Sequence, residues 1–324
     1  MQRRTFNALL AALPLAGLSR TSVVRSAPSA FVPAPTFDEA SRAIRGAIAH
    51  DAADPQLTPT ALPRFYEHGE SVEHAVVLLH GFTNSPQQFD ELARGFFARG
   101  CNVYVPRIPL HGRKNRLTEA LEKLTIDDLQ GCTYESYQLA RGLGKHVTVL
   151  GLSIGGTMAL WLAQTQSVDL AIPIAPFLMP IGFPRWLGMM AMHALAILPN
   201  MYWWWDPRVK EKSLPVYAYP GFPTHALAQI VFLGADVFAL AGKAVPAARQ
   251  CILVTNANES AVNDGVAHEL FAIWKQHGAR YRQVVLRDLG KPRHDIIDPT
   301  TFPQARTLVY PILESLVLDT PTHS

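Results

Sequence analysis

Two kinds of apolar pattern alternate along the chain. Continuous apolar runs, such as residues 75–79 and 170–174, are typical of strands buried on both faces of a parallel sheet. Between such runs, apolar residues recur every three or four positions, which predicts amphipathic helices. The predicted strands span residues 64–68, 75–79, 102–105, 147–150, 170–174, 252–255 and 281–286, and helices are predicted near 87–99, 126–143 and 155–164. This alternation predicts an α/β fold with a doubly wound, mostly parallel sheet.

A leading helix precedes the first predicted strand. Thr36 and Glu39 have the spacing of a capping box, and apolar residues follow from Phe37 at helical intervals. This box predicts that the helix begins directly after Thr36.

The alternation stops between residues 177 and 245, in a segment rich in Met, Trp, Pro and Phe. Because the segment is too long for a simple loop, we expect an inserted helical cap that divides the core domain into residues 31–176 and 246–324. Six large side chains in it are candidates either for lining an apolar pocket or for forming the core of the cap: Met189, Met190, Met192, Trp203, Trp204 and Trp205.

The first thirty residues differ in composition from the rest. Arg3 and Arg4 precede an apolar stretch at residues 8–18, and small residues follow at 26–30. This order is typical of an export signal, and the arginine pair resembles the twin-arginine type. The apolar stretch is too short to span a bilayer. We therefore expect residues 1–30 to direct export of the protein, so that it is periplasmic or secreted.

Charge and cysteine content exclude several classes of protein. The 29 basic and 26 acidic residues are interspersed and give a formal net charge of +3, so no basic stripe suits a nucleic-acid backbone. Cys101, Cys132 and Cys251 lie far apart and form neither a zinc motif nor a disulfide framework. We expect no nucleic-acid partner and no cofactor. The sequence gives no indication of the oligomeric state.

Ser153 is the candidate nucleophile. It lies in the sequence GLSIG at residues 151–155, between a predicted strand and a predicted helix. Glycines two positions before and after a serine permit the sharp strand-to-helix turn that raises a nucleophilic hydroxyl above a sheet. The alternative is a tight turn with an inert serine.

Backbone groups are the expected donors to the oxyanion that such a nucleophile creates. His80, Gly81 and Phe82 follow the strand predicted at 75–79, which places an early loop near the nucleophile. The candidate oxyanion hole consists of the N–H groups of Phe82 and Ile154. We expect His80 and the later His111 to fix their loops by hydrogen bonds rather than to act in catalysis.

The general base and its acidic partner are expected late in the chain. His294 follows the last predicted strand, where a loop can reach over Ser153. The acid is expected between the serine and the histidine in chain order. Glu259, four residues after the strand at 252–255, is the first candidate and Asp264 the alternative. Asp295 and Asp298 follow the histidine and fit this order less well.

At these motifs the chain resembles the α/β hydrolases, and among them the carboxylesterases and monoacylglycerol lipases. HGFTNSPQQF at residues 80–89 is similar to the family's HGFTGSP-type oxyanion loop, and VPRIPLHG at 105–112 is similar to its PRLPGHG loop. The similarity extends from about residue 64 to residue 311. The chain departs from the family at Leu110, where glycine is usual, after Gly112, where the serine of GHGxS is absent, and at Glu259, where aspartate is common.

The resemblance implies acyl transfer to water through a serine ester, with Ser153, Glu259 and His294 as the triad. Together with the apolar cap, it predicts a serine hydrolase that cleaves carboxylic esters of apolar acyl groups. The expected substrate is a small-molecule ester or lipid, and contact with a membrane surface is left open. The alternatives are an amidase or peptidase, an acyltransferase or a cofactor-free peroxidase on the same fold, and a lipid-binding protein with a vestigial triad.

Overall fold

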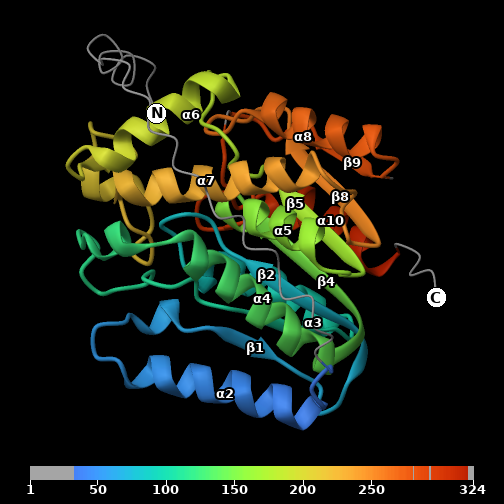
Figure 1. The fold of residues 1–324 in the computed structure, drawn as a ribbon. Helices are drawn as coiled ribbons and strands as arrows, with labels where there is room; N and C mark the ends of the chain where they lie inside the picture. Colours follow the sequence, from blue (N-terminus) through green and yellow to red (C-terminus); the bar gives the residue numbers. More distant parts are fainter. Residues whose placement is uncertain (1–32, 280, 292, 320–324) are drawn as a thin grey trace.

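A seven-stranded sheet forms the centre of the computed structural model, which describes residues 33–279, 281–291 and 293–319 (Figure 1). The strand order is β1-β3-β2-β4-β5-β8-β9; β1 runs antiparallel to β3, and the other neighbours are parallel. The strands are β1 (Arg64–Tyr66), β2 (Val72–Leu79), β3 (Asn102–Val105), β4 (Gly144–Leu152), β5 (Leu170–Ile174), β8 (Gln250–Asn256) and β9 (Arg282–Leu286). The predicted α/β fold with a mostly parallel sheet is confirmed.

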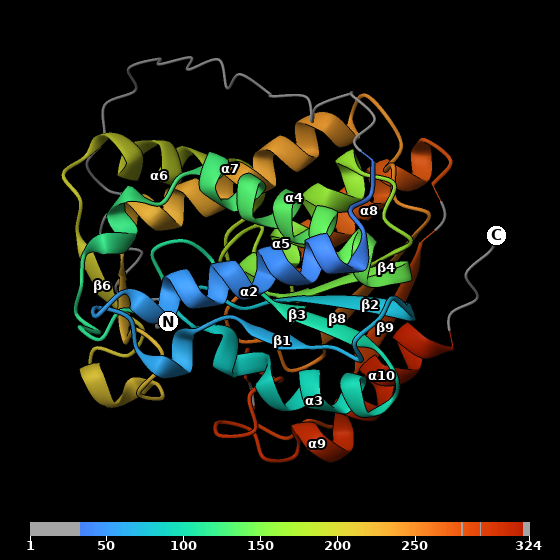
Figure 2. The same ribbon diagram turned by 90° about the horizontal axis from the view of Figure 1, so that it is seen from below.

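Helices cover both faces of this sheet (Figure 2). One face carries α3 (Asp90–Ala98) and α10 (Tyr310–Leu318), with the short α9 (Ala305–Leu308) beside them. On the other face lie α4 (Ile126–Leu143), α5 (Ile154–Thr165), α7 (Thr224–Ala241) and α8 (Asp264–Gln276). Residues 154–164 of α5 are all buried, because α5 packs against the sheet, α4 and α7. This central helix begins directly after Ser153.

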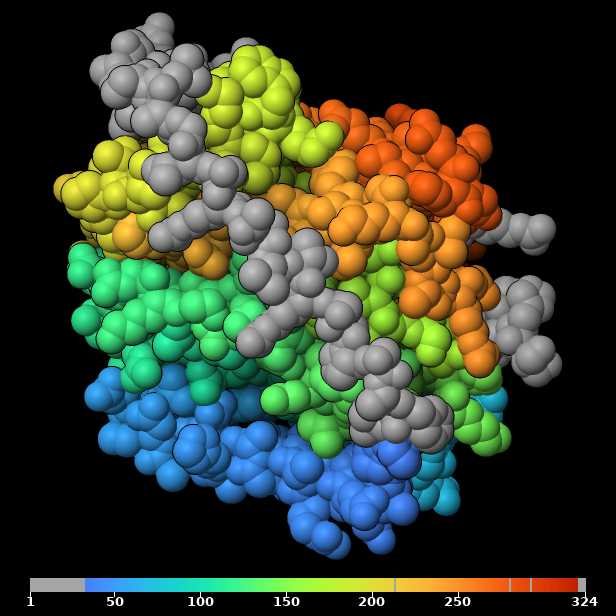
Figure 3. All heavy atoms as spheres, in the orientation of Figure 1, coloured from blue at the N-terminus to red at the C-terminus, as the bar shows by residue number. Residues whose placement is uncertain are grey.

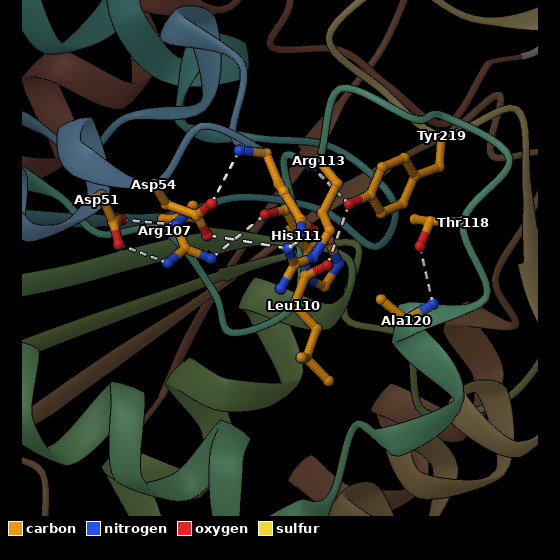
Figure 4. Close-up of polar contacts among 10 residues, drawn as sticks. Asp51, Asp54, Arg107, Leu110, His111, Arg113, Thr118, Ala120 and Tyr219 are labelled. Atoms are coloured by element: carbon orange, nitrogen blue, oxygen red, sulfur yellow. Dashed lines mark hydrogen bonds and ion pairs between the residues drawn. The ribbon is translucent and has the colours of Figure 1, made fainter.

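The leading helix α2 (Phe37–Ala53) lies outside α4 and starts at the predicted capping box. Thr36 and Glu39 exchange the two expected hydrogen bonds, at 2.8 and 3.3 Å. Near the other end of the helix, Asp51 accepts two hydrogen bonds from the Arg107 guanidinium, both at 2.6 Å (Figure 4). Because Arg107 also donates to the carbonyl of His111, α2 anchors the loop after β3.

The segment after β5, where an inserted helical cap was expected, contains small elements whose bounds the sequence did not predict. They are helix α6 (Arg185–Ile197), the antiparallel pair β6 (Tyr202–Trp204) and β7 (Gly221–Pro223), and a short helix η4 (Lys210–Ser213) between these two strands. In the space-filling view this segment forms the upper left of the molecule (Figure 3). Helix α7 follows β7 and packs on α5 and α6 alike, so it joins the segment to the sheet. The boundaries of the cap at 177 and 245 remain a prediction.

Helix α7 is the one described helix that is long and apolar enough to cross a membrane. Within the fold, however, 67% of this stretch is buried. A core helix of a folded domain has the same length and composition, so this similarity is weak evidence for a membrane span. The predicted export signal at residues 1–30 lies outside the described residues, and export remains a prediction.

Candidate active site

Ser153 lies at the turn between β4 and α5. Its backbone angles are φ 59° and ψ −115°, a region that costs a non-glycine residue free energy. The turn is held because the Ser153 N–H donates to Ile174 and the Ser153 carbonyl accepts from Phe177, both at 3.0 Å. A strained serine held between a strand and a helix is the geometry expected of a nucleophile.

The two glycines around Ser153 are required by close backbone approaches. A Cβ atom on Gly151 would lie 2.2 Å from the carbonyl oxygen of Gly155. A Cβ atom on Gly155 would lie 2.0 Å from the carbonyl oxygen of Leu79. The second approach places the start of α5 against the end of β2, three residues before Phe82.

The loop after β2 leaves the N–H of Phe82 without an acceptor. The neighbouring Gly81 N–H donates to Gln88 Oε1 at 2.7 Å, and the Thr83 N–H donates to His111 Nε2 at 3.2 Å. Among the described residues, no hydrogen bond uses the N–H between them. Ile154 is the first residue of α5, and such an N–H has no acceptor within its helix. Both predicted oxyanion donors are therefore available.

His80 and His111 brace the loops after β2 and β3 against each other. His80 Nε2 accepts from the Ile108 N–H at 3.1 Å, and His111 Nε2 accepts from the Thr83 N–H at 3.2 Å. The Nδ1 atom of each ring lies 2.9 Å from a carbonyl of its own loop. Burial lowers both pKa values, that of His80 well below its usual range and that of His111 to about 4. The expectation that both histidines fix loops is confirmed.

His294 and Glu259 form a hydrogen-bonded pair, with 2.9 Å between His294 Nδ1 and Glu259 Oε1. The same oxygen accepts from the N–H groups of residues 260–262 at 2.8, 2.7 and 3.3 Å, which fixes the carboxylate. On the other side of the ring, His294 Nε2 is buried and has no partner among the described residues. This arrangement leaves Nε2 available to accept a proton.

The charges of this pair stabilise each other. Burial opposes ionisation of Glu259, but His294 and the hydrogen bonds outweigh it and hold the pKa of Glu259 below its usual range. Burial also opposes protonation of His294, but Glu259 and the charges of Asp295 and Asp264 raise the pKa of His294 above its usual value. An imidazolium formed here is therefore stabilised, as a general base requires.

Asp264, the alternative acid, begins helix α8. Its Oδ1 atom is buried without a hydrogen-bond partner in the described part of the chain. Burial and the neighbouring charge of Glu259 raise the pKa of Asp264 to about 6. The structure therefore brings Glu259 into contact with His294 and leaves Asp264 beside the pair.

Aromatic side chains of the segment after β5 pack over the loop after β2. Trp205 Nε1 donates to Thr83 Oγ1 at 2.8 Å, and the ring centroid of Trp205 lies 4.5 Å from that of Phe222. Phe82 packs against the same two rings, at 6.2 and 5.4 Å. The Tyr219 N–H donates to the Thr83 carbonyl at 2.7 Å. Trp205 is thus the predicted cap tryptophan that contacts the candidate oxyanion loop directly.

The methionines of the cap have different surroundings. Met192 is buried in the core, and Met190 is 51% exposed. Met189 lines a hollow of about 280 Å³ between α6, α7 and α8, together with Met179, Phe238 and other residues. None of the residues that line this hollow belongs to the predicted triad.

Two of the three departures from the family's sequence pattern have structural consequences. Leu110 adopts φ 66°, so the usual glycine is replaced by a residue that must be held in the left-handed region. Its carbonyl accepts from Tyr219, which also accepts the Arg113 N–H (Figure 4). The longer side chain of Glu259 still reaches His294.

Gln88 is buried and Asp295 is half-buried, and the sequence pattern did not reveal the contacts of either residue. Gln88 Nε2 donates to Asp295 Oδ2 at 2.7 Å. Asp298 accepts a hydrogen bond from Tyr217 OH in the segment between β6 and β7. The position of Asp295 directly after His294 was the one signal available in the sequence.

In the residues that the structure describes, no three His, Cys, Asp or Glu side chains come together in a group that would hold a metal ion.

The alpha/beta hydrolase family matches residues 76–305, and the chain belongs to this family. This match begins within β2, ends at the first residue of α9, and includes Ser153, Glu259 and His294.

The chain is also similar to one individual protein over part of its length. The chain is 34% identical to a thermostable monoacylglycerol lipase of Bacillus sp. (strain H-257) over 104 residues, which are 32% of this chain and 39% of that relative. The chain thus aligns with well under two thirds of the relative's length.

Solved structures share the fold at low identity. A structure from the pair LipS and LipT, two metagenome-derived lipolytic enzymes, is 22% identical, with a TM-score of 0.58 over 79% of this chain and 98% of the other. A monoacylglycerol lipase of Paleococcus ferrophilus is 16% identical, with a TM-score of 0.57 over 78% and 98%. A soluble variant of the monoglyceride lipase of Saccharomyces cerevisiae is 13% identical, with a TM-score of 0.57 over 81% and 92%.

Proposed function

We propose that this protein is a serine hydrolase that cleaves carboxylic esters of apolar acyl groups through an acyl-serine intermediate. The observation that carries this proposal is the His294–Glu259 pair, whose Nε2 atom is buried and unpartnered in the described part of the chain while Ser153 occupies a strained turn. The matched segment of a monoacylglycerol lipase supports an ester or lipid as substrate.

In the proposed reaction, His294 Nε2 takes the proton of Ser153 Oγ, and the oxygen attacks the ester carbonyl carbon. The N–H groups of Phe82 and Ile154 donate to the resulting oxyanion. His294 then gives its proton to the departing alcohol, which leaves an acyl ester on Ser153. Water repeats the attack with His294 as base and releases the acid. Glu259 holds the imidazole orientation and stabilises the imidazolium throughout.

Two measurements test this proposal. We expect Ser153→Ala to lose measurable turnover of p-nitrophenyl esters, because no other group in the reaction supplies the nucleophile. We also expect a fluorophosphonate probe to label the wild type and not the variant. Persistent turnover in the variant would rule out Ser153. An unlabelled, inactive wild type that binds fatty acids would instead favour the lipid-binding alternative.

We further propose that the substrate is taken from a lipid aggregate, with α6 at its surface. Trp186, Met190 and Ile197 follow one side of α6 at helical spacing and are 66%, 51% and 63% exposed. Helix α6 contains no acidic residue, so no fixed negative charge opposes contact with anionic lipid. Single exposed apolar residues are common, but a row on one helix is typical of an interaction surface.

A further inference from the structure

The side chain of Gln88 connects the two loops on which the proposed reaction depends. Gln88 lies in the short helix η2 (Pro86–Phe89) and is 2% exposed. Its Oε1 accepts from the Gly81 N–H at 2.7 Å, and its Nε2 donates to Asp295 Oδ2 at 2.7 Å. A side-chain amide offers an acceptor and a donor on one planar group, so the Gln88 side chain satisfies both contacts at once.

On one side, Gln88 fixes the backbone that carries an oxyanion donor. Gly81 directly precedes Phe82, and a Cβ atom on Gly81 would lie 3.4 Å from Gln88 Oε1, so the amide packs closely on this backbone. The hydrogen bond from the Gly81 N–H limits rotation of the chain just before the Phe82 N–H. A donor that is oriented in advance stabilises an oxyanion better than one that must first be ordered.

On the other side, Gln88 holds the residue next to His294. The Oδ1 atom of Asp295 accepts from the N–H groups of Ile297 and Asp298, at 3.0 and 3.1 Å. The donor from Gln88 occupies the other oxygen, so both oxygens of Asp295 are hydrogen-bonded. Burial and the charge of Asp298 raise the pKa of Asp295, and the Gln88 donor opposes this rise. Loss of that donor would leave one oxygen of this half-buried carboxylate without its partner, which is costly.

We propose that Gln88 is a positioning residue that sets the Phe82 N–H and the His294 ring in a fixed relation to each other. The two loops are far apart in the sequence, since Gln88 and Asp295 are separated by 207 positions. Gln88 does not touch the reacting atoms and acts through Gly81 and Asp295. This role presupposes the proposed hydrolysis at Ser153.

Three substitutions change the hydrogen bonds of Gln88 with Gly81 and Asp295 in different ways. Gln88→Met removes both hydrogen bonds at nearly constant volume. Gln88→Glu keeps an acceptor for Gly81 but places a second carboxylate against Asp295. Asp295→Asn removes the charge beside His294 and presents the Gln88 amide with a less favourable partner. We expect each to lower kcat by about 10- to 100-fold with KM changed by less than about threefold, because small misplacements of catalytic groups reduce the rate by such factors.

The double variant Gln88→Glu/Asp295→Asn is the decisive test. In it, the amide nitrogen introduced at position 295 can donate to the carboxylate introduced at position 88, while the amide oxygen still accepts from Ile297 and Asp298. The second carboxylate oxygen can still accept from Gly81. Every hydrogen bond is thereby restored with one direction reversed, so we expect kcat to return to within about fivefold of the wild type.

Gln87→Met is the matched control. Gln87 is the neighbouring glutamine, and its Oε1 accepts from Arg64 at 3.0 Å; in the described part of the chain, the hydrogen bonds to Gly81 and Asp295 come from Gln88 instead. We expect its kcat to be unchanged. The positioning role is wrong if Gln88→Met keeps its kcat, or if the double variant is no faster than the product of the single effects predicts. Labelling of the wild type by a fluorophosphonate tests Ser153 separately, so a failure of the proposed hydrolysis is recognised independently.

Discussion

At the scale of single residues, the site is defined by which side chains of the described structure touch. Glu259, not Asp264, contacts His294, and its second function is to accept three backbone N–H groups that hold it in place. A carboxylate anchored in this way can orient a histidine without changing its own position. The extra methylene of glutamate, compared with the aspartate common in related enzymes, is accommodated by this anchoring.

Glu259→Gln is expected to lower kcat by about 10³- to 10⁴-fold, because the amide neither stabilises the imidazolium nor selects the required tautomer. Asp264→Asn is the control and is expected to cost less than about tenfold, since Asp264 makes no hydrogen bond to His294 among the described residues. Steady-state hydrolysis of p-nitrophenyl butyrate measures both. A larger loss in the Asp264 variant would assign the acid to Asp264.

The pH dependence follows from the raised pKa of His294. The base must be neutral to take the serine proton, so kcat/KM should fall as the pH drops through the pKa of His294 in the free enzyme. We expect the midpoint of this fall above about 6.5, the ordinary value for histidine. Removing the charge of Glu259 should move the midpoint downward. A rate profile from about pH 5 to 9 checks this, and a midpoint below about 6 in the wild type would contradict it.

At the scale of elements, three segments meet around the candidate oxyanion loop. The loop after β2 is braced by the loop after β3 through His80 and His111, and helix α2 holds the latter loop through Arg107. The pair of strands β6 and β7 contacts the loop after β2 through Trp205, which directly follows β6. These contacts keep the Phe82 N–H fixed although its loop has no regular structure of its own.

The two bracing histidines should make the fold sensitive to acid. Each Nε2 accepts a hydrogen bond and must be neutral, and the folded pKa values lie below 6.5. Their contribution is therefore complete above the unfolded pKa and is lost as the pH falls from about 6.5 toward 4. We expect the free energy of unfolding in urea to decrease over this range, and to decrease less in His111→Gln. An equal decrease in both proteins would show that His111 does not titrate on unfolding.

At the scale of the whole molecule, the apolar row on α6 predicts a dependence on the physical state of the substrate. Trp186→Ser and Met190→Ser should lower the rate on emulsified monoacylglycerol about three- to tenfold while leaving monomeric p-nitrophenyl acetate unaffected, because only the aggregate offers a surface. Leu308→Ser, on the exposed side of α9, is the control. Equal losses on both substrates would show that α6 supports the fold and does not contact lipid.

The strands of this molecule were predictable because their signal is local. The ranges of β3, β5 and α4 agree with the prediction residue for residue, since continuous apolar runs and helical spacing depend on neighbours in the chain. The turn at Ser153 was predictable for the same reason, because two glycines and a serine at this spacing favour one backbone geometry. A helical segment was expected after β5, but the bounds of α6 and the presence of the β6–β7 pair were not predicted, because an apolar segment without clear periodicity does not distinguish helix from strand.

The sequence by itself thus determined the seven strands of the central sheet and the turn at Ser153, and it supplied Phe82, Ile154 and His294 as candidate site residues. It left Glu259 and Asp264 as alternatives. Only the tertiary structure decided which of these carboxylates meets the histidine and that Gln88 links Gly81 to Asp295. The physical reason is that these contacts join residues 35 and 207 positions apart, whose distance depends on how the sheet and its loops pack.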